Sequence, residues 1–181
     1  GACVTEELFP GFRISTASYS LSLLLPQIIS ELGLELDIRL KEPKVFAPSL
    51  EGGGLFIWRD PKRAHEAISE ISPKDADAYE RFEDMFDEAA KRLRPLLTYA
   101  ATRKQARRAF RKSHIERLFK QTVDAAIADL CEEYFETDLM QGLMASQGII
   151  GSAAGPRTPG TAYIYLHHAF GEAAGESGAW G

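Results

Sequence analysis

Residues 148–168, GIIGSAAGPRTPGTAYIYLHH, constrain the fold most, because they interrupt a chain whose other segments are largely amphipathic. Glycines allow close backbone approach or positive φ, and prolines stiffen the turns around them. Two interpretations stay open: the stretch forms the wall of a cavity, or it is an ordinary connection into a buried strand. The cavity interpretation would present aromatic and imidazole side chains from the strand-like end, namely Tyr163, Tyr165, His167 and His168. We therefore place the candidate site here.

The first 59 residues predict two kinds of local structure. Residues 1–15 read as a loop with short extended pieces, broken at Pro10 and Gly11. An apolar helix is expected from Ser15 or Thr16. Pro26 either interrupts it or starts a new first turn, and Gly33 is expected at the helix end. Residues 34–40 alternate apolar and charged side chains, which is the period of a half-buried strand, and residues 44–59 read as a hairpin. Phosphate binding by the triple glycine at 52–54 is not expected, because the spacing of a phosphate loop is missing.

Residues 60–147 predict a series of helices. Asp60-Pro61 and Ser72-Pro73 each combine a capping side chain with a proline at the first helical position. The second signal starts a long helix to about residue 100, which Pro95 is expected to kink. Its apolar stripe contains Tyr79, Phe82, Phe86, Leu93, Leu96 and Leu97, whereas Glu80, Glu83, Asp87 and Lys91 are expected off it. Thr137 is expected to cap a last helix that turns Leu139, Leu143 and Met144 inward. The predicted class is α+β with helix dominant.

Charge is divided between neighbouring segments. Residues 103–120 hold eight of the 21 basic residues and one acid, Glu116, whereas residues 124–138 carry acids without Lys or Arg. Mutual neutralisation or a solvated face is the simpler interpretation, and contact with an anionic partner is the alternative. The formal net charge of −5 gives no general case for nucleic acid, and aromatics are not interleaved with the basic residues as base stacking would require.

The chain carries none of the common catalytic or metal-binding patterns. His167 and His168 are adjacent and would point to opposite faces of a strand, and no HExxH is present, so we expect no metal site. No GxSxG is present, and neither Cys3 nor Cys131 has a histidine nearby in sequence. Two widely spaced cysteines favour a reduced compartment, and the N-terminus lacks the features of a signal peptide. No apolar run reaches the roughly 18 residues of a membrane span, so we expect a cytoplasmic protein.

Several motifs in order resemble one family. They are GACVTEE at 1–7, PGF at 10–12, STASY at 15–19, LSLLLP at 21–26, WRD at 58–60, GTAY at 160–163 and LHH at 166–168. This pattern resembles the phytoene-desaturase-like FAD-dependent oxidoreductases, in the branch of pyridine nucleotide-disulfide oxidoreductase domain-containing proteins. The family has a double glycine before the V-T-E-E motif, and only Gly1 represents it here.

The resemblance implies a substrate-side piece of a flavoenzyme. The GxGxxG unit that holds FAD would lie before Gly1 and the closing flavin-binding segment after Gly181. Residues near the cofactor would be Gly1, Ala2, Val4 and Thr5. Residues lining the substrate cavity would be Gly160, Thr161, Tyr163, Tyr165, His167 and His168, with no catalytic residue assigned. The expected organisation is a single domain, 1–181, with a junction loop and apolar helix at 1–33, short strands at 34–59, a helical insert at 60–147, and the glycine-rich loop and cavity-lining strand at 148–181.

The leading hypothesis is an oxidoreductase or desaturase region that acts on an apolar or amine-like substrate, with hydride passing to flavin N5. The chain alone is expected to be inactive and to bind FAD weakly or not at all. Expected partners are the substrate and the missing FAD-binding part, and exposed apolar surface is expected to cause dimerisation. The alternative is a non-enzymatic helical module whose 103–120 helix contacts a protein partner, an anionic surface or a peripheral membrane.

Overall fold

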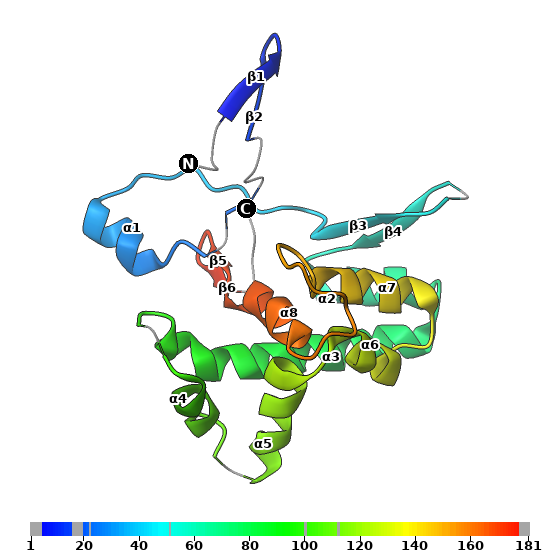
Figure 1. Cartoon of the computed structure of the whole chain (residues 1–181). Helices are drawn as coiled ribbons and strands as arrows, with labels where there is room; N and C mark the ends of the chain where they lie inside the picture. Colours follow the sequence, from blue (N-terminus) through cyan, green and yellow to red (C-terminus); the bar gives the residue numbers. More distant parts are fainter. Residues whose placement is uncertain are drawn as a thin grey trace. The chain divides into compact units, whose positions relative to one another are not determined.

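A computed structural model describes residues 5–15, 20–21, 23–50, 52–99, 101–111 and 113–177 (Figure 1). Helices and small antiparallel sheets make up its elements, which confirms the predicted α+β class. The chain forms two compact units, which we call unit 1 (Gly1–Lys41 and Gly171–Gly181) and unit 2 (Glu42–Phe170). The predicted single domain and its internal boundaries stay predictions.

Unit 1 consists of short elements. The extended pieces predicted here are strands β1 (Thr5–Phe9) and β2 (Phe12–Ser15). They pair as an antiparallel hairpin in which Glu6 lies opposite Ile14, a pairing that was not predicted. Helix α1 (Pro26–Leu32) ends at Gly33, whose left-handed φ of 59° is the predicted helix end. Strands β5 (Glu172–Ala173) and β6 (Glu176–Ser177) form a second small hairpin.

Two predictions for this part of the chain need correction. Residues 23–25 carry no regular structure, so the expected apolar helix begins only at Pro26, and its predicted start at 16–19 lies outside the described residues. The strand predicted over residues 34–40 is wrong, because this segment belongs to no sheet. An alternating pattern forms a strand only where a second strand takes its backbone hydrogen bonds.

Unit 2 begins with the predicted hairpin and two capped helices. Strands β3 (Val45–Pro48) and β4 (Gly54–Ile57) pair in antiparallel register, and Leu55 and Ile57 are buried. Helix α2 (Pro61–Ser69) packs on β4 and is capped by Asp60, whose side chain accepts from the Lys62 N–H. Helix α3 (Pro73–Leu93) is capped by Ser72, so both predicted caps are confirmed.

Helix α3 is shorter than predicted. It passes at Leu93 into the 3₁₀ turn η1 (Arg94–Leu96), which contains Pro95, because proline cannot donate the next helical hydrogen bond. The remaining elements are α4 (Arg103–Arg108), α5 (Ser113–Phe119), the π-helical turn η2 (Lys120–Asp124), α6 (Ile127–Tyr134), α7 (Asp138–Gln147) and α8 (Thr161–Phe170).

The core of unit 2 is organised around Phe82. Its ring centroid lies 5.0–5.3 Å from four other aromatic rings on α3, α6, α8 and the residue after α6, namely Phe86, Tyr134, Phe135 and Tyr165. Tilted and edge-on aromatic pairs at this spacing add to the free energy of apolar burial. The predicted stripe is confirmed for the four members on α3, which are buried, and its last two members, Leu96 and Leu97, are half-buried beyond the end of α3.

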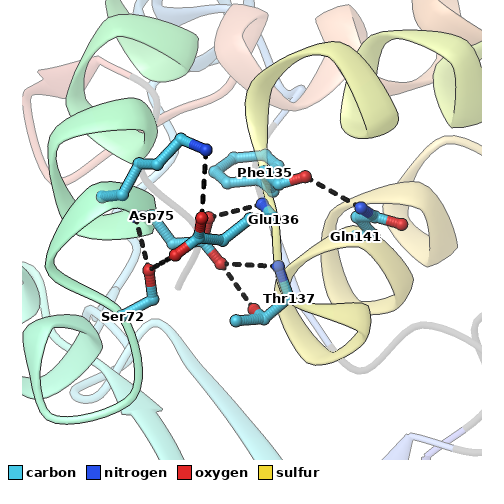
Figure 2. Close-up of polar contacts among 7 residues, drawn as sticks. Ser72, Asp75, Phe135, Glu136, Thr137 and Gln141 are labelled. Carbon is cyan, nitrogen blue, oxygen red and sulfur yellow. Dashed lines mark hydrogen bonds and ion pairs between the residues drawn. The ribbon is translucent and has the colours of Figure 1, made fainter.

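Asp75 joins the start of α3 to the turn between α6 and α7 (Figure 2). The fully buried carboxylate accepts from the backbone N–H of Glu136 at 2.7 Å, from the N–H of Thr137 at 3.1 Å and from the Thr137 hydroxyl. Ser72 donates to Glu136 at 2.7 Å, and Lys74 pairs with the same carboxylate at 3.0 Å. The acidic residue at the third helical position was predicted, but its bonds to the turn between α6 and α7 were not.

Thr137 also caps α7, as predicted, but the inward face of that helix differs from the expectation. Met140 and Met144 are buried and Leu143 is half-buried, whereas Leu139 is 38% exposed. Residues four apart share a helix face, so burial of Met140 and Met144 turns Leu139 outward.

The basic and acidic segments neutralise each other in part. Between the two segments, Arg103 pairs with Asp124 at 2.7 Å and Arg117 pairs with Glu133 at 3.2 Å, whereas Arg107 pairs with Glu116 within the basic segment. These exposed pairs each contribute about 0–1 kcal/mol, so their main consequence is reduced positive charge on α4 and α5.

Candidate functional site

The expected cavity-lining strand is wrong, because residues 161–170 form helix α8. Residues 162–166 do alternate between apolar and polar side chains, as in a strand. Their burial nevertheless follows the period of a helix. The buried positions are Thr161, Ala162, Tyr165, Leu166 and Phe170. Tertiary contact with α3 and η2 therefore decides the structure of a short ambiguous segment.

The glycine-rich loop before α8 lies against the turn before α6. The Gly160 N–H donates to the carbonyls of Asp124 and Ala125 at 2.9 and 3.0 Å, and Gly160 has a φ of 90°. The N–H of Ala128 donates to the Pro156 carbonyl at 3.0 Å. Gly148 packs so closely on Ile127 that an added Cβ would lie 2.6 Å from its side chain. These contacts favour the interpretation of the loop as a packed connection.

The helix separates the six predicted cavity residues. Thr161 is buried and structural, since its hydroxyl accepts from the Ile127 N–H at 2.9 Å and donates to the Thr158 carbonyl at 2.8 Å. Tyr163 is 45% exposed. Tyr165 and His168, one turn apart, have ring centroids 6.0 Å apart, whereas the half-buried His167 places Nδ1 2.9 Å from the Ile164 carbonyl.

Tyr165 leads to a polar cluster centred on Glu83, which was predicted to lie off the buried stripe. The Tyr165 hydroxyl donates to Glu83 Oε1 at 2.7 Å, and Lys44 Nζ lies 3.3 Å from Oε2. The Glu83 and Lys44 side chains are only 33% and 30% exposed. We call Lys44, Tyr79, Glu83, Tyr165 and His168 the Glu83 cluster. Glu83 follows Phe82 directly, and a stripe wider than 100° includes such flanking positions, which is the signal that could have revealed it.

Burial controls the acid–base state of the cluster. Burial and the Glu83 charge raise the pKa of Tyr165 well above its usual value, and the same two causes raise the pKa of Tyr79. Burial, followed by the charge of His167, lowers the pKa of His168 to about 4. Burial and the Glu83 charge raise the pKa of the nearby Asp87. At neutral pH the cluster therefore offers neutral phenols and a neutral imidazole around one lysine–carboxylate pair.

This arrangement can orient a polar group of a ligand, but it contains no activated nucleophile. Cys131 is buried, and burial raises the pKa of its thiol to about 12, so the thiolate is scarce. Within the described ranges no group of three or more His, Cys, Asp or Glu side chains is placed to hold a metal ion. No described helix is long and apolar enough to cross a membrane.

Most of the residues predicted to lie near the cofactor are outside the described part of the chain. Gly1, Ala2 and Val4 are not described, and Thr5 is exposed at the start of β1 opposite Ser15. Dinucleotide-binding folds hold FAD on parallel βαβ units, and the sheets of the described residues are all two-stranded and antiparallel. The described residues contain no parallel βαβ unit, and weak or absent FAD binding by the chain stays a prediction.

Comparison with known proteins gives one clear similarity. The chain is 33% identical, over 99% of its length, to proteins named pyridine nucleotide-disulfide oxidoreductase domain-containing protein 2 from Mus musculus and Rattus norvegicus. The aligned stretch covers 36% of each relative, so the chain spans little more than a third of their length. No family model matches the chain. No solved structure gives a significant match. Over nearly its whole length, the chain is therefore similar to part of an oxidoreductase-domain protein of mouse and rat.

Proposed function

We propose that the chain is the substrate-side region of an FAD-dependent oxidoreductase of the phytoene-desaturase-like kind, acting on an apolar or amine-like substrate. The observation that carries the proposal is the 33% identity across 99% of the chain to proteins whose name includes an oxidoreductase domain. FAD, when bound to the parent protein, would supply the hydride-accepting chemistry, and this region would bind and position the substrate.

The surface of unit 1 supports the presence of a further polypeptide part. Nine of its large apolar side chains are exposed by 39–69%, and α1 has no buried residue; the nine are Leu8, Phe9, Phe12, Ile14, Leu23, Ile28, Leu32, Leu34 and Leu36. By contrast, the hydrophobic core cluster lies within unit 2. Exposed apolar surface of this extent is typical of an interface. We propose that the FAD-binding part of the parent protein covers it, and that the chain alone self-associates.

The alternative, a module that binds through residues 103–120, is not favoured. Two of its arginines, Arg103 and Arg117, already pair with acids of residues 124–138, and Arg107 pairs with Glu116 of its own segment. We further propose a cytoplasmic location, which agrees with the buried free thiol of Cys131.

The proposal is tested with three proteins: this chain, the mouse relative, and a chimera in which this chain replaces its matching segment of the mouse relative. FAD titration followed by absorbance should show binding by the relative and the chimera and little by the chain. Light scattering should show that the chain grows in mass with concentration, whereas the chimera keeps the association state of the mouse relative. Stoichiometric FAD binding by the chain alone would contradict the proposal, as would absence of flavin from the mouse relative.

A further inference from the structure

The outer face of the β3–β4 hairpin carries a row of three neighbouring aromatic rings. Phe46 and Phe56 are cross-strand partners, and their rings are nearly parallel with centroids 4.4 Å apart. The centroid of the Trp58 ring lies 5.7 Å from that of Phe56. We call these three residues the aromatic ladder. Phe46 and Phe56 are 48% and 41% exposed, although the other face of the same hairpin is buried. Single exposed apolar residues are ordinary, but three neighbouring rings form a contiguous patch.

The Arg63 guanidinium lies at the Trp58 end of the aromatic ladder. The Arg63 guanidinium lies 3.7 Å from the centre of the Trp58 ring, which is the distance of direct stacking. Within the described residues, Arg63 forms no ion pair and its guanidinium makes no hydrogen bond. A guanidinium that stacks through its face keeps its N–H donors free at its edge, where they suit a carboxylate.

The ladder is also held in place by its surroundings. Leu55 and Ile57 anchor β4 in the core, and α2, which carries Arg63, packs on the same strand. Gly54 makes room for the first ring, because an added Cβ would lie 2.7 Å from Phe46 Cε2 and 2.3 Å from the Ala47 carbonyl. A preformed surface loses little conformational entropy when a ligand binds.

From this juxtaposition we propose that the aromatic ladder and Arg63 form a binding site for a small anionic amphiphile. The alkyl or aromatic part of the ligand lies along Phe46, Phe56 and Trp58, and its carboxylate pairs with Arg63. The exposed rings select for apolar surface and the unpaired cation selects for negative charge. This inference goes beyond the proposed function and does not require it.

The test uses quenching of Trp58 fluorescence. The chain has two tryptophans, so a Trp180→Phe variant leaves Trp58 as the reporter. The probe is a dodecanoate carrying two bromines at mid-chain, kept below its critical micelle concentration, because bromine quenches an indole on contact. The uncharged probe is the corresponding dibromododecanol. We expect saturable quenching by both, with tighter binding of the carboxylate.

Three substitutions in this background separate the parts of the site. Arg63→Gln should weaken carboxylate binding by about two- to fivefold, as expected for an exposed ion pair, and leave the alcohol unchanged. Phe46→Thr should weaken both probes by about three- to tenfold, through loss of an aromatic contact. The matched control is Arg108→Gln, since Arg108 is exposed on α4 and has no ion pair in the described part of the chain. It should leave both affinities unchanged.

Each result that contradicts the proposal identifies the part of the site that is wrong. Absence of saturable quenching overturns the site, and equal effects of Arg63→Gln on both probes overturn the role of the cation. Equal weakening by Arg108→Gln would mean nonspecific charge attraction. Quenching only above the micelle concentration would mean a lipid aggregate surface, and a rise in mass that removes quenching would mean that a second copy covers the ladder. None of these readouts depends on flavin, so failure here is distinguishable from failure of the proposed function.

Discussion

Replacement of Asp75 by alanine is expected to lower the free energy of unfolding by about 3 kcal/mol. The change removes the acceptor of two backbone N–H groups and one hydroxyl at the turn before α7 (Figure 2). A donor left buried without its partner costs about 1–3 kcal/mol. At the upper end of that range, three such donors would cost well above the expected value. The expected loss corresponds to the low end of the cost for each donor, because Glu136 is exposed and Thr137 is half-buried. Water can therefore reach part of the turn.

The measurement is urea unfolding followed by circular dichroism, with the slope against urea compared between variants. Asp75→Asn should fall between wild type and Asp75→Ala, because the amide keeps one acceptor oxygen. Asp77→Ala is the matched control on the same helix. Its carboxylate is 67% exposed and meets only His65 among the described residues, so it should cost about 0.5 kcal/mol or less. A loss below about 1 kcal/mol for Asp75→Ala, or one equal to the control, would refute the reasoning.

Three further predictions concern α8 and the loop before it. Gly148→Ala should destabilise by about 1–3 kcal/mol in urea unfolding, because its Cβ would meet Ile127, whereas Gly155→Ala, with open space around it, should be near neutral. Tyr165→Phe should lower the free energy of unfolding by about 1 kcal/mol in the same assay, since it removes the hydroxyl that donates to Glu83. An unchanged free energy of unfolding would show that this hydrogen bond contributes nothing. Between pH 6.5 and about 4, wild type should lose up to about 3 kcal/mol more stability than His168→Gln, because the unfolded histidine gains a proton there and the folded one does not. Parallel pH profiles of the two proteins would contradict the lowered pKa.

Local capping chemistry made the helix starts predictable. The side chains of Asp60, Ser72 and Thr137 each accept from the first turn of the following helix, and this depends only on residues close in sequence. The hairpin at 44–59 was predictable for the same reason, because turn residues and alternation are local.

The errors arose where distant contacts decide the structure. Residues 161–170 have apolar alternation suited to a strand, yet packing on α3 and η2 makes them a helix. Residues 34–40 have the same alternation and no strand partner. The candidate site shows this limit most clearly: Tyr165 was predicted, but its partner Glu83 lies 82 positions away, and no short-range pattern joins them.

The central claim, that this chain is the substrate-side region of a flavoenzyme, is tested most directly by comparing the chimera with the mouse relative. Both proteins would be loaded with FAD, and anaerobic flavin reduction would be followed by absorbance against a panel of apolar and amine substrates. The account predicts equal FAD affinity and a changed order of preferred substrates, because only the substrate-side region differs. Loss of FAD affinity in the chimera, or an unchanged substrate order, would contradict it.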